Sequence, residues 1–510
     1  MGNIQLGFKW CIVSGQMKEI KRKTRCFMQI STHLSETKKI LKTMLPLGTS
    51  FDLLTRDLLF GKTEAFFFGI DGFVKDDIMF YILNRLQKTE LPLQNIQNLS
   101  EWIQAQIPYI EVSENKNINE TIQMVLSGMS ALLIDGFDTA ILLDTRTYPV
   151  RGVGEPDMEK VARGPRDGFV ETIVLNTALV RRRIRDPRLT FEMFQIGSQS
   201  KTDIALGYIG NIVDQKLLAQ IRNQLNAIDV HALNMGAKSL EELLIRKVWY
   251  NPLPQVRYTE RPDVAAAHLL EGYILLFIDT TPEVIILPTT FFQFTQSAED
   301  YYQNPAVGNY LRFVRFAAIF ASLLLTPTWL MLTEAGISWS PFFTVHEKIA
   351  VPLVLQIILL ELGLDLFRYV SSHAPSNLSG SLGLIGGLII GDVAVQIGWI
   401  TQEVMFYTAI TALTTFAASA LDFTYAIRIF RFVLIVCTGL FHIWGYILGI
   451  IYIVLTIITT PTIGGKKYTW PLYPFDKSAF LSLVFRQAVP KIQDKNYGQL
   501  QNRYNKHSNH

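Results

Sequence analysis

The sequence predicts a two-part protein: an α/β N-terminal region of two related small subdomains, followed by an all-α domain that crosses a membrane several times. Three observations support this prediction. Apolar residues make up 49% of the chain, and they concentrate after Leu311. Residues 126–145 and 270–289 align without a gap, which indicates a duplicated unit. Residues 349–370 are apolar and long enough to cross a bilayer, since about 20 residues at a rise of 1.5 Å cover the hydrocarbon core.

Length, charge and cysteine content exclude several classes of protein. A chain of 510 residues is too long for one ordinary domain. The formal net charge of +3 gives no sign of a nucleic-acid partner. The cysteines at 11, 26 and 437 lack the spacing of a disulfide framework or a metal site, which is typical of a reducing cytosol. The N-terminus lacks the apolar core of a signal peptide, and Leu6 stands where a myristoylation signal has Ser or Thr.

We expect five regions along the chain, divided where mixed polar sequence gives way to apolar segments. The N-terminal α/β region is expected in the cytoplasm, because no export signal precedes it. The regions are a partly disordered N-terminal segment (1–45), two cytoplasmic α/β subdomains (46–150 and 151–300), a membrane domain of four to six segments (301–465) and an interfacial and cytoplasmic tail (466–510).

The first subdomain is predicted to begin with a helix, a strand and a second helix. Leu34–Leu45 has the pattern of a short helix, although it falls in the N-terminal segment. Ala65–Ile70 reads AFFFGI and is closed by Asp71-Gly72, as a strand and its turn are. Asp76–Leu86 then predicts a helix. The acids of the turn IDGFVKDD are interpreted as a solvated turn and helix start rather than as a site.

The duplicated segment predicts one β-hairpin in each subdomain. Both copies have Leu-x-Gly, an apolar run, Ile-Asp, a short turn and a second apolar run that ends in Thr. Asp135 and Asp279 occupy the equivalent turn positions, and we interpret them as turn formers rather than catalytic groups. Each subdomain is therefore expected to hold a small mixed sheet covered by helices.

Between the hairpins we predict helices over Phe169–Ile184, Ile204–Asn226 and Ser239–Lys247, and an extended connector over Asn251–Asp263. The first of these helices ends in a run of arginines that suits a phosphate or anionic headgroup, or alternatively a subunit contact. RGPRDG lacks the Gly-Lys-Ser/Thr ending of a phosphate loop. The candidates for an oligomer interface or an anionic ligand are Arg163, Arg166, Arg181, Arg182, Arg183 and Arg185.

The membrane domain is predicted from its apolar segments. We expect Phe313–Leu332, Ile349–Tyr369, Leu382–Gly398 and Met405–Leu421 to be the first four. Ile429–Thr459 is too long for one ordinary span, so it forms either a hairpin that breaks near Gly445 or one tilted helix. Arg428 and Arg431 are interpreted as anchors on the cytoplasmic side. The basic tail favours a cytoplasmic C-terminus, with Thr469–Asp476 at the lipid interface.

Polar residues within lipid depth are the main functional signal. A charge near the bilayer centre costs about 2.5–3.5 kcal/mol, so such residues face water or the protein interior. The candidate pore-lining residues are Gln356, Glu361, Asp365, Asp392 and Gln396. Glu361 and Asp365 share one helix face, and Arg368 is placed to balance Asp365. Copies of these carboxylates around an axis would form acidic rings, as in cation pores, or they would instead fasten helices together within one chain.

No enzyme class, metal or cofactor is predicted. His346, His373 and His442 are scattered without a second ligand at metal spacing. TVHEK is not the HExxH zinc pattern, and no serine or cysteine lies in a nucleophile elbow.

Several long motifs resemble those of one family. They are SFDLLTRDL from Ser50, IDGFVKDD (70–77), ARGPRDGFVETIVLNTALVRRRIRDPRL (162–189), TVHEKIAVPLVLQIILLELGLDLFRYVSSHAPS (344–376), GLIIGDVAVQIG (387–398) and WPLYPFD (470–476). Together they cover about residues 45–490. The chain resembles the A-subunits of GerA-type spore germination receptors, most closely the stage V sporulation protein AF branch.

The resemblance implies an integral protein of the spore inner membrane that assembles as a homo-oligomer, a pentamer, around an ion path. For the stage V branch it implies ion release that amplifies germination, with a small membrane protein as partner. For receptor A-subunits it implies B- and C-type partners and nutrient sensing, which is the alternative function. A secondary transporter is a third class, but the membrane segments show no inverted repeat.

Overall fold

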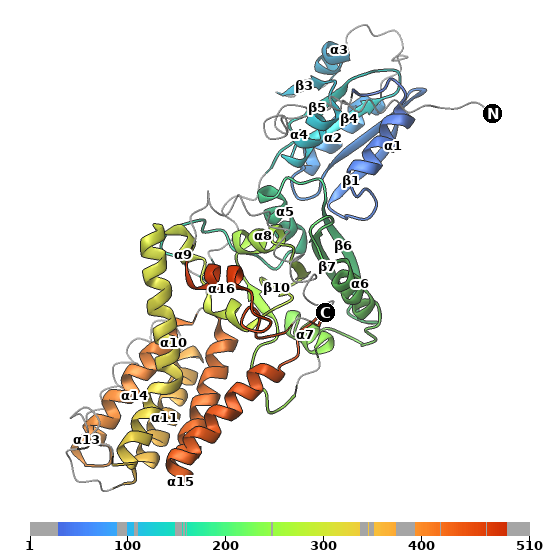
Figure 1. Ribbon diagram of the computed structural model, residues 1–510. Coiled ribbons are helices and arrows are strands. Elements are labelled where there is room, and N and C mark those ends of the chain that lie inside the picture. The colour runs from blue at the N-terminus through green and yellow to red at the C-terminus, as the bar shows by residue number, and fades with distance from the viewer. Residues whose placement is uncertain are drawn as a thin grey trace, which may run out of the picture. The chain divides into compact units, whose positions relative to one another are not determined.

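The computed structural model describes residues 29–88, 99–106, 111–147, 156, 159, 161–245, 248–336, 345, 351–373, 393–418, 420–465 and 467–486. The chain divides into two compact units. The first holds residues 1–47 and 53–148, and the second holds residues 48–52 and 149–510. Both units are drawn in Figure 1.

The first unit is an antiparallel five-stranded sheet with helices on both faces. Its strand order is β1-β2-β4-β5-β3. Phe67 packs with α2 and α3, whereas Lys38 of α1 lies over the ring of Phe66. Because neighbouring residues of a strand face opposite ways, α1 covers the other face. The strands are β1 (Leu53–Phe60), β2 (Thr63–Ile70), β3 (Val112–Asn115), β4 (Ser130–Ile134) and β5 (Ala140–Leu143), and the helices are α1 (Leu34–Met44), α2 (Asp76–Gln87), α3 (Leu99–Gln106) and α4 (Ile118–Leu126).

The second unit contains a sheet of the same topology, β6-β7-β9-β10-β8, again antiparallel throughout. One apolar cluster joins the sheet to α6 and α7, and another joins it to α5 and α8. The strands are β6 (Leu189–Ile196), β7 (Thr202–Ile209), β8 (Arg257–Thr259), β9 (Ile274–Ile278) and β10 (Val284–Leu287), and the helices are α5 (Ile173–Arg183), α6 (Gln215–Asn226), α7 (Ala237–Leu244) and α8 (Pro262–Leu270).

The duplication extends to individual hydrogen bonds. Asp135 Oδ1 accepts the backbone N–H of Leu34, at 2.9 Å, and Asp279 Oδ1 accepts that of Ile173, at 3.2 Å. In each case the donor is the first residue of the helix that opens the subdomain, and that helix has no cap bond from its own N-cap side chain. The predicted hairpins are therefore confirmed. The turn aspartates also satisfy a helix N-terminus that would otherwise keep a free donor.

Asp279→Ala is expected to destabilise the second subdomain by about 1 kcal/mol, the usual loss for a helix N-cap side chain. Asp279→Asn should retain most of that stability, because its amide oxygen accepts the same bond. The midpoint of thermal unfolding of the full chain in detergent measures both. Equal midpoints for the alanine variant and the wild type would show that the bond contributes nothing.

Several features of the α/β region differ from the prediction. The sheets are antiparallel rather than mixed, and strands β1 and β6 have no counterpart in the prediction. The helix predicted over Ile204–Asn226 is wrong in its first half, which is strand β7; α6 begins only after Asp214, whose carboxylate accepts the N–H groups of Lys216 and Leu217. From Ile204 to Ile209, β7 is buried on both faces, and such an apolar run has no periodicity that distinguishes a strand from a helix.

Helix α5 starts four residues later than predicted. The Asn176 side chain accepts the backbone N–H of Val170, at 2.8 Å, and donates to the same residue's carbonyl oxygen, at 2.5 Å. These bonds hold the preceding residues in a loop. The short side chain of asparagine favours such local bonds over helix propagation.

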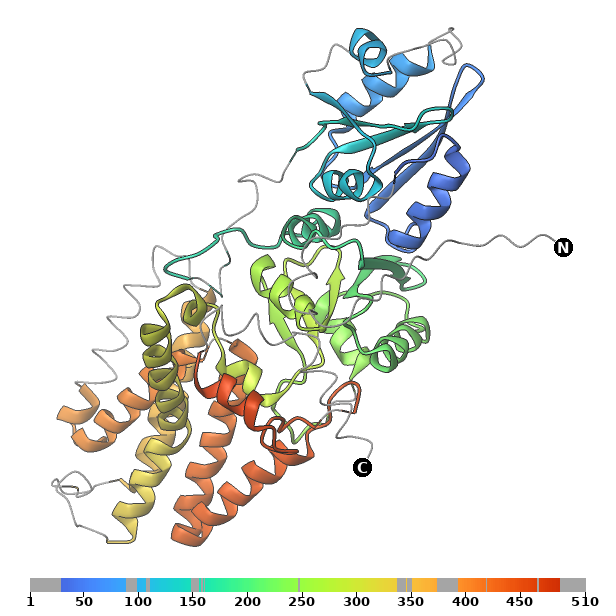
Figure 2. The same ribbon diagram turned by 45° about the horizontal axis from the view of Figure 1, so that its top comes forward.

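The second unit continues into a helix bundle (Figure 2). Two of its helices, α10 and α15, are long and apolar enough to cross a membrane. Pro327 of the predicted first span lies inside α10. The predicted third segment lies mostly in residues 374–392, outside the described residues. The elements are η3 (Phe291–Thr295), α9 (Glu299–Tyr302), α10 (Pro305–Glu334), α11 (Leu353–His373), α13 (Ala394–Gln396), α14 (Gln402–Thr414), η6 (Thr415–Ala417), α15 (Leu421–Thr459) and α16 (Lys477–Val484).

Helix α15 is a hairpin, as one of the two predictions for this segment proposed. Its helical geometry breaks at His442, where φ is 50° and ψ is −132°. A Cβ atom on Gly445 would lie 1.8 Å from the carbonyl oxygen of Cys437, so only glycine allows the two halves to meet there. The rings of Phe430 and Tyr452 are 6.2 Å apart, although about 33 Å of straight helix would separate these residues.

Both ends of α15 lie beside the second α/β subdomain. Near its start, the ring of Phe423 stacks on Phe294 of η3 at 5.6 Å. At its end, Thr460 accepts a hydrogen bond from Asn251 Nδ2, at 2.9 Å. The break lies at the opposite end of the bundle, where His442 Nδ1 is 2.8 Å from Glu334 Oε2 at the end of α10. The α/β subdomain therefore marks one end of the bundle and the α15 break marks the other.

Candidate functional site

A buried ion pair connects α11 and α15 in the middle of the bundle. Arg431 Nη2 donates to Glu361 Oε2 at 2.7 Å, and both side chains are buried. Arg431 Nη1 also donates to the carbonyl oxygen of Ser322, at 2.7 Å, and to Thr415 Oγ1, at 3.3 Å. Arg431 follows the start of α15 by ten residues, about 15 Å along the axis. The pair therefore joins α10, α11, α15 and η6 about halfway between the start of α15 and its break at His442.

Asp365 lies one turn further along α11 and has a different environment. Its Oδ1 atom is 3.2 Å from Arg368 Nη1 and 3.2 Å from Arg428 Nη1. The carboxylate side chain is 44% exposed, whereas the two arginines are 19% and 14% exposed. With Glu361 and Arg431 included, the cluster has three cations and two anions, a formal charge of +1. Its most exposed member is nevertheless negative, because the guanidinium groups lie behind it.

The remaining pore-lining candidates divide between the interior and the surface. Gln356 is buried; its Nε2 donates to the carbonyl oxygen of Val351, at 2.7 Å, and its Oε1 accepts the N–H of Thr401, at 2.9 Å. It thereby caps the start of α14 from α11. Gln396 is exposed in α13, and Asp392 lies outside the described residues.

Arg428 and Arg431, which the sequence suggests as anchors on the cytoplasmic side, lie against the α11 carboxylates. The sequence does contain a signal for this pairing, since two carboxylates spaced i, i+4 in one apolar segment match two arginines spaced i, i+3 in another. Charges in apolar segments lower their cost by pairing with one another.

The α5 arginines separate into structural and exposed groups. Arg181 is fully buried and forms a bidentate pair with Asp52, with Nε–Oδ2 at 2.7 Å and Nη2–Oδ1 at 3.1 Å. It also donates to the carbonyl oxygens of Asp186 and Leu189. Arg183 Nη2 contacts both oxygens of Asp167, at 2.7 and 2.6 Å. The other four candidates, Arg163, Arg166, Arg182 and Arg185, are exposed.

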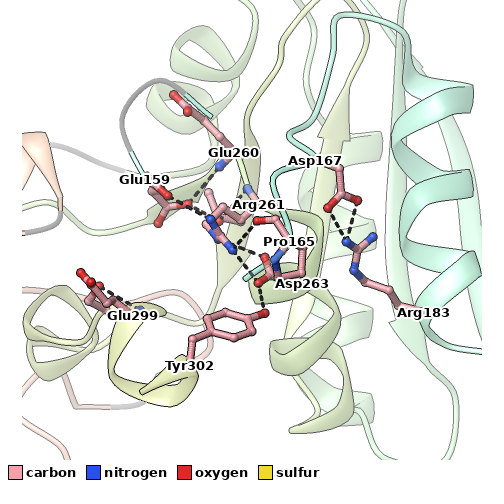
Figure 3. Close-up of polar contacts among 11 residues, drawn as sticks. Glu159, Pro165, Asp167, Arg183, Glu260, Arg261, Asp263, Glu299 and Tyr302 are labelled. Carbon is pink, nitrogen blue, oxygen red and sulfur yellow. Dashed lines mark hydrogen bonds and ion pairs between the residues drawn. The ribbon is translucent and has the colours of Figure 1, made fainter. Parts of the chain in front are cut away.

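The GPRDG loop beside α5 is held by Arg261, a residue that no sequence pattern singled out. Figure 3 shows its guanidinium reaching the carbonyl oxygens of Glu159 and Pro165, at 3.1 and 3.2 Å, and the carboxylate of Asp263, at 2.8 Å. Tyr302 donates its hydroxyl to the same carboxylate. Burial alone would raise the pKa of Asp263, but the bonds from Arg261 and Tyr302 outweigh it and lower that pKa. This part of the loop is a packed ion-pair network.

Glu159 in the same network has the opposite shift. Burial raises the pKa of its carboxyl group, and the charge of Arg257 and the hydrogen bond from Thr259 only partly offset that effect. Within the described ranges, no three His, Cys, Asp or Glu side chains come together as metal ligands.

Comparison with known proteins identifies the relatives of this chain. A profile of the Bacillus/Clostridium GerA spore germination protein family matches residues 39–497. The chain belongs to the GerA family. This match confirms the family resemblance, and the matched range includes both sheets, the helix bundle and the charge cluster. The structure confirms the predicted fold class, an α/β region followed by a helical domain.

Several proteins of the GerA family match over most of their length. Stage V sporulation protein AF of Bacillus subtilis is 37% identical over 89% of this chain and 93% of its own. Spore germination protein KA of Bacillus subtilis is 29% identical over 89% of this chain and 84% of its own. The crystal structure of the N-terminal domain of the A subunit of a Bacillus megaterium spore germinant receptor is 28% identical, covers 52% of this chain and 99% of that domain, and aligns with a TM-score of 0.40.

Proposed function

We propose that this GerA-family chain is a subunit of a homo-pentameric cation channel of the spore inner membrane, with its N-terminal region in the cytoplasm. The assembly would release ions during germination and amplify the response, together with a small membrane partner protein. The family membership supports a germination role, and the similarity to stage V sporulation protein AF supports this branch of it. The observation that carries the conduction step is the exposure of Asp365.

Asp365 lies at the edge of an outward, apolar stripe of α11. The stripe follows the 3–4 spacing of one helix face. Its exposed members are Leu355, Leu359, Leu362, Leu366 and Tyr369. A carboxylate that faced lipid there would cost about 2.5–3.5 kcal/mol. An assembly that turns this stripe toward a shared water-filled axis removes the cost and places one carboxylate of each subunit in a ring, as cation pores do.

The other polar candidates have supporting roles in this proposal. Glu361 and Gln356 hold α11 against α15 and α14, so they fix the position of Asp365. Arg368 and Arg428 hold the carboxylate from behind, which orients it outward. Gln396 is exposed, and it and Asp392 are further candidates for the same path.

Asp365→Asn is expected to lower the conductance for K⁺ several-fold and to reduce the preference for K⁺ over Cl⁻. The variant loses the exposed negative charge while Arg368 and Arg428 remain. Single-channel recording of the purified chain in liposomes, under a KCl gradient, measures both quantities. Asp57→Asn is the matched control, because it removes an exposed carboxylate from β1, outside the bundle.

Two results would contradict the proposal at different levels. Unchanged selectivity of Asp365→Asn would remove this residue from the pore. A wild-type chain without conductance, which instead binds a germinant and needs B- and C-type partners to respond, would favour a receptor A-subunit. Spore germination protein KA, which matches nearly the whole chain, makes that second function the alternative.

A further inference from the structure

We propose that the second α/β subdomain is anchored in the bilayer interface by its own side chains, in addition to its chain connection to α10. The anchor is a surface made of Trp249, Tyr250, Leu472, Tyr473 and Phe475, here called the interfacial belt. It combines a loop between α7 and β8 with the segment that follows α15. Its partner is the headgroup and upper acyl region of the lipid on the side of the α/β subdomain.

The Trp249 loop is fastened along the last turns of α15. Tyr452 Oη donates to the carbonyl oxygen of Tyr250, at 2.8 Å, and Asn251 Nδ2 donates to Thr460 Oγ1, at 2.9 Å. The two attachment points on α15 are eight residues apart, about 12 Å along the helix. Figure 1 shows the segment after α7 descending beside the end of α15. Because Tyr250 and Asn251 are adjacent in the chain, the Tyr452 side chain covers most of this distance, and the loop lies beside the last two turns of this apolar helix.

Beside these turns Trp249 is 96% exposed, and its ring centre lies 5.9 Å from that of Tyr250 in an edge-to-face arrangement. The nearby α15 side chains Leu455 and Ile458 are 54% and 56% exposed. If the second half of α15 lies in lipid, Trp249 lies where lipid-facing side chains begin. Tryptophan is concentrated at this boundary in membrane proteins, because its ring is largely apolar and its N–H needs a polar partner.

The segment after α15 supplies the second part of the belt. Tyr468 Oη donates to the carbonyl oxygen of Pro254, at 2.7 Å, so this segment lies against the chain that follows the Trp249 loop. Leu472, Tyr473 and Phe475 are 48%, 59% and 65% exposed. The ammonium group of Lys467 lies 4.0 Å from the centre of the Tyr473 ring. Exposed aromatics beside a cation are typical of a lipid headgroup boundary.

Continuity with α15 favours lipid over a protein partner. The Trp249 loop continues the exposed apolar surface of α15, since it is bonded to Tyr452 and Thr460, and the segment after α15 is bonded to Pro254 beside that loop. This inference does not depend on ion conduction, so a chain that failed the conductance test could still show the anchor.

Spin labels test the position of the belt in the full chain. The three native cysteines are replaced by serine, and a nitroxide is attached at Trp249→Cys, Phe475→Cys or Met235→Cys. Met235 is the matched control, because it is also highly exposed in the second subdomain but does not belong to the belt. The adjacent Gly236 lies against Thr281, in the turn between β9 and β10. In phosphatidylethanolamine–phosphatidylglycerol vesicles, the ratio of collisions with oxygen to collisions with an aqueous nickel chelate is expected to be several-fold higher at 249 and 475 than at 235.

Two outcomes would overturn the proposal. A ratio at 249 equal to that at 235 would place the loop in water, and a label at 249 shielded from both reagents would show that protein covers it. A second measurement avoids the cysteine variants: lipids brominated near the headgroup should quench the wild-type tryptophan fluorescence more than that of Trp249→Phe. Equal quenching of the two proteins would also reject the anchor.

Discussion

Glu361→Gln is expected to destabilise the helix bundle by about 3–5 kcal/mol, the usual cost of leaving one member of a buried ion pair uncompensated. Arg431 would keep its bonds to the Ser322 carbonyl and to Thr415, but no anion would balance it at the centre of the bundle. Replacing both members, by Glu361→Met with Arg431→Met, is expected to be nearly neutral, because apolar groups of similar volume need no counter-charge.

Thermal unfolding of the single and double variants in detergent measures this non-additivity. Asp365→Asn serves as the control, since its carboxylate is half-exposed and its loss leaves the Glu361–Arg431 pair intact. If Glu361→Gln were as stable as the double variant, the pair would not be fastening the helices. A double variant that folds and still conducts would assign Glu361 to packing rather than to the pore.

The duplicated hairpins could be predicted because their signal is local. Each has two apolar runs, a turn aspartate and a matching copy 144 residues away, so one alignment identifies both. Strands β1 and β6 were missed because polar residues interrupt LLTRDLLF and LTFEMFQI, and what stabilises them is pairing with the next strand. Pairing between segments that are distant in the sequence also decides that β3 joins β5 and that β8 joins β10, both in antiparallel orientation.

The candidate site was predictable only in part, for a related reason. Charges inside the apolar segment 349–370 identify it as the segment to explain, whatever their partners are. The partner of Glu361 is 70 residues away, and the matching spacing of Arg428 and Arg431 is the one sequence signal that connects the two segments. The break in α15 is a second example. The length of the apolar segment predicts that a break can occur, but the backbone angles are needed to place the break at His442.

The Asp52–Arg181 pair provides the second prediction with a large effect. Asp52→Asn is expected to cost about 3–5 kcal/mol, because Arg181 would remain fully buried without an anion. The loss should also loosen the segment around Asp52. Ser50 Oγ donates to Asp52, at 2.6 Å, and accepts the N–H of Phe191 at 2.9 Å, so this segment is held against the edge strand β6 through the pair.

Thermal unfolding and hydrogen exchange at residues 48–52 check this expectation in the full chain. Arg185→Gln is the matched control, since it removes an exposed arginine of the same run and should change stability by less than about 0.5 kcal/mol. The comparison separates the two interpretations of the α5 arginines. If Asp52→Asn is as stable as the wild type, the ion pair does not hold the core together, and Arg181 stays a candidate for an anionic ligand. If that variant alone loses stability, Arg181 belongs to the subdomain core. Ligand or subunit contacts are then left to the exposed arginines.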